Sequence, residues 1–136
     1  MILDQLIQEL KDDEGMRLKP YTDTKGNLTI GVGRNLTDKG ITYNEAQMLL
    51  LNDIVDCEKD LDKWAPWWRD MTEVRQRALM NMCFNLGWPR LREFHSMLLH
   101  LKNGEYMLAA ASALHSLWAS QVGGRAQRIA TMMRNG

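Results

Sequence analysis

The segment from Arg17 to Leu36 departs from the helical pattern of the rest of the chain. It contains Thr, Tyr, Ile and Val, and the turn sequence DTKGN separates two short extended pieces within it. Before it, apolar residues recur at helical spacing over residues 2–13, and Gly15 is a natural helix stop. A small antiparallel sheet among helices restricts the chain to an α+β fold.

The rest of the sequence is helical. Thr42 and Glu45 form a capping box that opens a long helix, which Pro66 ends. Further helices are predicted at about 72–86, 90–102, 105–118 and 125–134. We therefore predict one domain, 1–136, that is mostly α-helical. It has a small N-terminal lobe of about 12–45 with the short sheet, a long connecting helix, and a helical C-terminal lobe of about 64–136 that also includes helix 2–13.

The charges of the chain balance, with 17 basic and 17 acidic residues. This balance argues against a nucleic-acid partner bound by sheer charge. The longest apolar run, 107–111, is too short to span a bilayer, so we expect no stable membrane insertion. The first residues are acidic where a signal peptide would be basic. We therefore expect no signal peptide and synthesis in the cytoplasm.

The cysteines and histidines do not suggest a metal site. Cys57 and Cys83 lie within helical patterns and are interpreted as reduced core thiols. The three histidines share no ligand-type spacing with Asp, Glu or Cys. We expect neither a metal nor another cofactor.

Two carboxylates, Glu14 and Asp23, flank the start of the extended segment. At a helix C-terminus the macrodipole disfavours the ionised form of Glu14, as a general acid requires. Asp23 lies in a turn rich in backbone donors and should stay ionised, which suits a base or a charge stabiliser. Such a pair is the apparatus of glycoside hydrolysis. Spacing alone favours a solvated helix end for Glu14 and an Asx turn for Asp23 over a catalytic pair.

The run Gly31-Val32-Gly33 is not a dinucleotide fingerprint, because the third glycine is absent and no long helix follows. Glycines here instead keep the backbone open, so that an extended ligand can lie close to it.

The stretch DEGMRLKPYTDTKGNLTIGVGRNLT resembles the N-terminal lobe of the T-even phage lysozyme family, the phage endolysins of glycoside hydrolase family 24. The family motif is E-G, a spaced Leu and Tyr, then D-T-x-G-x-x-T-I-G-x-G, and it is met without a gap from Glu14 to Gly33. The similarity continues through TYNEAQMLLLNDIVDCEKDL, VRQRALMNMCFNLG and GGRAQRIATMMR, and so covers nearly the whole chain.

The resemblance implies a two-lobed α+β lysozyme fold. It also implies a bacteriolytic muramidase that hydrolyses the β-1,4 bond between N-acetylmuramic acid and N-acetylglucosamine in peptidoglycan, causing host cell lysis. By resemblance, Glu14 is the general acid, Asp23 is the second carboxylate, and Thr29 helps to hold the attacking water. That trio implies an inverting mechanism, which needs carboxyl groups roughly 6.5–9.5 Å apart.

The resemblance also implies substrate contacts on both lobes. Phe84 matches a cleft residue but equally suits a core aromatic, and Arg125 matches an arginine near the catalytic glutamate but equally suits a surface charge. The chain departs from the best-known member at Arg34, where that member has His, and at Asn35. Ser112 is a tolerable match and Met97 is not. The expected substrate-binding set is Asn35, Phe84, Asn85, Met97, Ser112 and Arg125.

Trp64, Trp67 and Trp68 could stack on sugars, but beside a helical lobe they are better interpreted as a cover of the core.

Two other functions compete with the muramidase. A lytic transglycosylase needs one acid and no water-holding pair, so Asp23 and Thr29 argue against it. A catalytically dead wall-binding module is disfavoured by the intact carboxylates but allowed by the altered cleft contacts. The leading interpretation predicts a monomer whose partner is bacterial peptidoglycan. It would reside in the host cytoplasm, depend on a holin for release, and act on the cell wall from the periplasm.

Overall fold

The computed structural model describes residues 2–136. The chain divides into two compact units, one ending at Met48 and the other running from Leu49 to Gly136. The long helix α2 (Tyr43–Trp64) crosses the boundary between them. The predicted assignment of helix 2–13 to the helical lobe stays a prediction.

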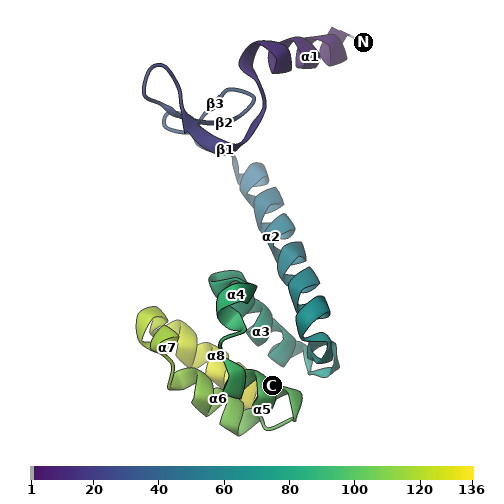
Figure 1. Cartoon of the computed structure of the whole chain (residues 1–136), viewed down its shortest axis with the longest axis vertical. Helices are drawn as coiled ribbons and strands as arrows, with labels where there is room; N and C mark the ends of the chain where they lie inside the picture. Colours follow the sequence, from purple (N-terminus) through teal and green to yellow (C-terminus); the bar gives the residue numbers. More distant parts are fainter. Residues whose placement is uncertain (1) are drawn as a thin grey trace. The chain divides into compact units, whose positions relative to one another are not determined.

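The first unit contains α1 (Ile2–Glu14) and a three-stranded antiparallel sheet in the order β1-β2-β3 (Figure 1). The strands are β1 (Arg17–Thr22), β2 (Leu28–Gly31) and β3 (Arg34–Asn35). The β1–β2 register shifts between Arg17 and Tyr21, where Pro20 has no N–H to donate. The predicted sheet is confirmed, with a third strand in addition.

The capping box at the start of α2 is confirmed. The N–H of Glu45 donates to Thr42 Oγ1 at 3.1 Å, and the N–H of Thr42 donates to Glu45 Oε1 at 2.9 Å. Two backbone donors that an isolated helix end would leave free are thereby satisfied.

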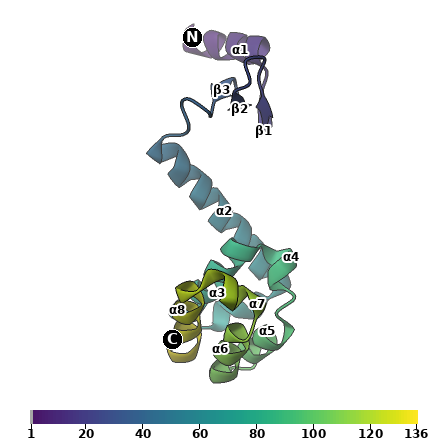
Figure 2. The same ribbon diagram turned by 90° about the vertical axis from the view of Figure 1, so that its left-hand side faces the viewer.

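The second unit contains the hydrophobic core. It also contains the remaining helices (Figure 2), which are η1 (Pro66–Asp70), α3 (Glu73–Leu86), α4 (Trp88–Leu91), α5 (His95–Lys102), α6 (Tyr106–Leu114), α7 (Leu117–Val122) and α8 (Gly124–Asn135). Helix α8 packs against α3, α6 and α7, while α5 packs against α6. The fully buried large side chains include Leu79, Met82 and Ile129.

Two predicted helices are each divided in the structure. The helix predicted at 90–102 breaks at Phe94, whose backbone is not helical and whose ring packs edge-on against Trp118 with centroids 6.2 Å apart. The helix predicted at 105–118 breaks at Ser116. Its hydroxyl donates to the carbonyl of Ala113 and accepts from the N–H of Ala119, which caps α7.

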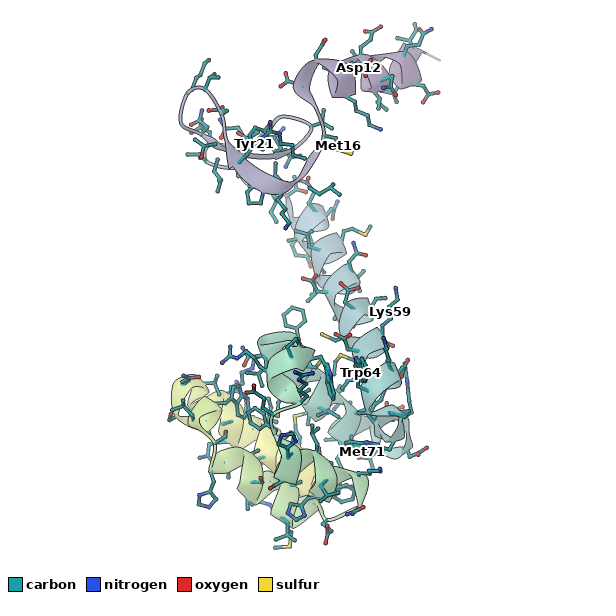
Figure 3. All side chains as sticks on the ribbon, viewed as in Figure 1. Asp12, Met16, Tyr21, Lys59, Trp64 and Met71 are labelled. Atoms are coloured by element: carbon teal, nitrogen blue, oxygen red, sulfur yellow. The ribbon has the colours of Figure 1, made fainter. Side chains whose placement is uncertain are left out.

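The three tryptophans near Pro66 do not share one environment. Trp68 is buried and Trp67 packs against the core, as predicted. Trp64, at the C-terminal end of α2 (Figure 3), is 54% exposed and lies beneath the ammonium group of Lys63. The prediction of a core cover is therefore wrong for Trp64. Cys57 and Cys83 are buried free thiols, as predicted.

Candidate active site

Glu14 is the last residue of α1, and its side chain is exposed. The helix ends because Gly15 adopts a φ of +74° while its N–H donates to the carbonyl of Lys11 at 2.9 Å. A left-handed residue after the last turn is the usual glycine stop. The predicted position of Glu14 at the helix end is confirmed.

The carboxylate of Glu14 lies against the backbone of Gly33, in the turn between β2 and β3. A Cβ atom built on Gly33 would be 2.7 Å from Glu14 Oε2 and 3.1 Å from Glu14 Cδ. Any side chain at this position would displace the carboxylate. Gly33 also has a φ of +65°, which L side chains rarely adopt. Residue 33 must therefore be glycine for Glu14 to hold this position.

Asp23 opens the turn between β1 and β2. Its Oδ1 accepts hydrogen bonds from the N–H of Lys25 at 2.9 Å and from the N–H of Asn27 at 2.8 Å. The hydrogen bond from Asn27 is the main cause that holds the pKa of Asp23 below its usual value, and the donor at Lys25 adds to it. Hydrogen bonds to a carboxylate favour the ionised form. These hydrogen bonds therefore stabilise the ionised carboxylate of Asp23.

Thr29 is the one buried polar residue among residues 2–136, with 3% of its surface exposed. Its hydroxyl donates to the carbonyl of Asn27 at 3.0 Å, and its backbone pairs with Tyr21 on one side and Asn35 on the other. The same carbonyl accepts the N–H of Asp23 at 2.9 Å. Asp23 and Thr29 are therefore positioned by one shared residue, Asn27.

A groove of about 610 Å³ lies beside the β2–β3 turn. Asn35 lines it, but the side-chain amide of Asn35 forms two hydrogen bonds with Asp38. Its Nδ2 donates to Asp38 Oδ2 at 3.0 Å, and its Oδ1 accepts from the N–H of Asp38 at 3.0 Å. The other lining residues are Ile30, Val32, Gly33, Arg34, Lys39, Ile41 and Glu45. Since Gly33 lines this groove and contacts Glu14, the groove adjoins the predicted general acid.

The helical unit has its own groove, of about 500 Å³, lined by Phe84 and Arg125. Phe84 is 43% exposed, so it is not a core aromatic. The guanidinium of Arg125 is held by Asn81, with Nε donating to Oδ1 at 2.9 Å. The structure thus brings Phe84 and Arg125 together. The predicted approach of Arg125 to the glutamate stays a prediction.

The other predicted contacts on the helical unit are dispersed. Asn85 Oδ1 accepts the indole N–H of Trp118 at 2.7 Å, which leaves the amide NH₂ of this exposed residue to face solvent. Ser112 lines a separate depression with His95 and Ser96. Met97 is completely buried in the core. A side chain with no exposed surface cannot contact a sugar, so the structure corrects the substrate role expected for Met97.

Sequence reasoning missed two contributors to this site. Asn27 positions Asp23 and Thr29 through its backbone N–H and carbonyl, and no pattern of residue types in the sequence reveals such a role. Arg34 donates through Nη1 to Glu45 Oε1 at 2.9 Å and to the carbonyl of Gly40 at 3.1 Å. Its only sequence signal is the departure from the histidine of the best-known member of the resembled family. Among residues 2–136, no three His, Cys, Asp or Glu side chains are grouped to hold a metal ion.

Comparison with known proteins assigns the chain to a family. The phage lysozyme family model matches residues 11–134. The chain is 32% identical to the pre-baseplate central spike protein Gp5 of Enterobacteria phage T4, over 96% of this chain but 28% of that protein. It is 24% identical to a probable T4-type lysozyme 1 of Dictyostelium discoideum, over 93% of this chain and 92% of that protein. It is also 32% identical to a SAR-endolysin of Bacteriophage PS119, over 58% of this chain and 48% of that protein. The chain belongs to the phage lysozyme family and is a lysozyme-type hydrolase.

Proposed function

We propose that the chain hydrolyses the β-1,4 bond between N-acetylmuramic acid and N-acetylglucosamine in bacterial peptidoglycan, with inversion at the anomeric carbon. The observation that supports this most is the pairing of Asp23 with Thr29 through Asn27. In this proposal the carboxylate and the hydroxyl, which share this backbone anchor, together hold one water molecule. A lytic transglycosylase has no use for such a site.

In this proposal Glu14 protonates the leaving glycosidic oxygen. Glu14 is an exposed residue at the end of α1, and its carboxyl group lies against the backbone of Gly33. A glycan strand can therefore approach it without meeting a side chain at position 33. General acid catalysis contributes about 10²–10⁴-fold to a rate.

Asp23 is the base in this proposal, and Thr29 orients the water. Asp23 Oδ1 already accepts two backbone N–H groups, so Oδ2 is the oxygen to which the water would donate. The hydroxyl hydrogen of Thr29 is committed to the carbonyl of Asn27, so its lone pairs accept from the water. A water that donates to both groups presents its own lone pair to the anomeric carbon.

Sugar contacts are proposed for Asn35, Phe84, Asn85, Ser112 and Arg125. The exposed ring of Phe84 offers an apolar face of the kind on which sugar rings pack, and the Arg125 guanidinium lies in the same groove. Asn85 offers its free amide N–H groups. These contacts would orient the strand and would not take part in bond cleavage.

No helix within residues 2–136 is long and apolar enough to cross a membrane. We propose that the chain works as a monomer on the cell wall, from the periplasm, after a holin releases it from the host cytoplasm. The similarity to an endolysin supports action on the wall.

The test compares the parent with Glu14→Gln, and uses Asp13→Asn as a matched control on the neighbouring exposed carboxylate of the same helix. Release of reducing ends from purified peptidoglycan should fall by about a hundredfold or more in Glu14→Gln and remain at the parent rate in Asp13→Asn. Proton NMR of the first products should show the α-anomer, which reports inversion.

Other outcomes would overturn the proposal. An early β-anomer would indicate a retaining enzyme, and a 1,6-anhydro product would indicate a transglycosylase. Sedimentation of the folded chain with peptidoglycan without release of fragments would indicate a binding module.

A further inference from the structure

The short turn between β2 and β3 sets the position of the Glu14 carboxylate. This turn consists of Val32 and Gly33, since β2 ends at Gly31 and β3 begins at Arg34. Gly33 touches the carboxylate so closely that a methyl group would not fit between them. Any movement of the turn therefore moves the surface against which Glu14 rests.

The strand that follows the turn is too short to fix it alone. β3 contains two residues, with the pairs Thr29↔Asn35 and Ile30↔Arg34 to β2. A two-residue strand at the edge of a sheet has few ladder hydrogen bonds, and edge hairpins are only marginally stable by themselves. Two further hydrogen bonds at Leu28 extend the pairing, one from the N–H of Leu36 to its carbonyl and one from its N–H to Thr37 Oγ1. A contact outside the sheet would fix β3 further, relative to α2.

Arg34 provides that contact. Its Nη1 donates to Glu45 Oε1 in the first turn of α2 and to the carbonyl of Gly40 in the preceding loop. The carboxylate of Glu45 is itself fixed, because Oε1 also accepts the N–H of Thr42 in the capping box. The residue next to Gly33 is thus tied to a helix terminus through a charge-assisted hydrogen bond, which is stronger than a neutral one.

We propose that Arg34 is a positioning residue for Glu14: with Glu45 it clamps the Val32–Gly33 turn against the Glu14 carboxylate. The residues involved all belong to the first unit, so the argument needs no contact outside it. This inference rests on the proposed function, because it concerns the reaction that Glu14 would catalyse. Position 34, where the best-known member of the resembled family has His, would thereby influence catalysis.

The kinetic test uses the purified chain of residues 1–136 with Arg34→Gln, Glu45→Gln and the double variant. Arg69→Gln is the matched control, because Arg69 also forms ion pairs, to Glu58 and Asp62, but in the helical unit. We expect kcat to fall by roughly tenfold to a hundredfold in Arg34→Gln, since small misplacements of a catalytic group have effects of that size. KM should change less than kcat. The double variant should lose no more than the worse single variant, and Arg34→Lys should recover part of the loss.

A readout that needs no turnover separates this inference from the proposed function. The carboxyl carbon of Glu14, observed by ¹³C NMR, should shift in Arg34→Gln and Glu45→Gln and remain at the parent value in Arg69→Gln. If the parent hydrolyses no peptidoglycan but these shifts occur, the proposed function fails and the positioning stands. Equal kcat in Arg34→Gln and Arg69→Gln, with an unmoved Glu14 resonance in folded protein, would overturn the positioning role.

Discussion

Asp23 and Thr29 are joined through the backbone of one residue. Asn27 donates its N–H to Asp23 Oδ1 at 2.8 Å, and its carbonyl accepts the Thr29 hydroxyl at 3.0 Å. This arrangement fixes a charged oxygen and a hydroxyl oxygen in relation to each other without a direct bond between them. The water-holding role proposed for Asp23 and Thr29 depends on this arrangement.

Replacing Thr29 with Val should distinguish the proposed role of its hydroxyl in holding the water from a contribution to the stability of the sheet. Thr29→Val keeps the shape and removes the oxygen, so kcat should fall by about tenfold or more if the hydroxyl orients the water. Thr37→Val is the control, because the Thr37 hydroxyl also bonds the sheet backbone, at the N–H of Leu28. That variant should lose about 0.5–1.5 kcal/mol of unfolding free energy, measured by urea titration, with kcat retained. A comparable loss of kcat in both variants would contradict the water-holding role.

Replacing Gly33 with Ala should impair catalysis beyond its effect on stability. The new methyl group would meet the Glu14 carboxylate, and both Gly33→Ala and Gly26→Ala would place alanine at a positive φ, which costs about 1–3 kcal/mol. A Cβ on Gly26 would meet no atom within 4 Å. We expect both variants to melt at lower temperature in calorimetry, and only Gly33→Ala to lose most of its kcat. Full activity in folded Gly33→Ala would show that the carboxylate can move without consequence.

The bond between Arg34 and Glu45 should make stability depend on acid pH. The Arg34 guanidinium, followed by the N–H of Thr42, lowers the pKa of Glu45 from 4.5 to about 2. The unfolded chain then binds more protons than the folded chain between these values. The stabilisation is therefore present above pH 4.5 and is lost as the pH falls toward 2. The difference in melting temperature between the parent and Glu45→Gln should shrink over that window. A constant difference would contradict the pairing.

Arg75 should be a main stabilising contact of the helical unit. Its Nε donates to the carbonyl of Met133 at 2.7 Å, its Nη2 donates to the carbonyl of Arg134 at 3.0 Å, and its guanidinium lies 3.5 Å from the ring centre of Tyr106. It thus satisfies carbonyls in the last turn of α8. Arg75→Met should reduce the unfolding free energy by about 1–3 kcal/mol, measured with urea. Arg77→Met, on an exposed position of the same helix, should stay close to the parent.

The two cysteines should be unreactive in the folded chain. Burial raises the pKa of Cys83 to about 12 and also raises that of Cys57. Because the thiolate is the reactive form, few reactive thiolates exist at neutral pH. A thiol reagent such as Ellman's should label neither residue in native buffer and both in denaturant. Rapid labelling of the native chain would show that the core opens at α2 and α3.

The sequence alone determined those features of this protein that depend on residues close together in the chain. The box of Thr42 and Glu45 placed the start of α2, and Gly15 placed Glu14 at the end of α1, because capping involves residues only a few positions apart. The family motif from Glu14 to Gly33 identified the candidate carboxylates. Each of these signals lies within one short stretch of chain.

Tertiary packing decided the rest. Helical periodicity ran through Phe94 and Ser116, yet the helices break there, since the ring of Phe94 packs on Trp118 and the Ser116 hydroxyl caps α7. Met97 falls where the resembled family has a cleft contact, but its side chain is enclosed by the core. The contact of Gly33 with Glu14 joins residues nineteen positions apart. Such contacts depend on which surfaces meet when the chain folds, and no local pattern of residues encodes that meeting.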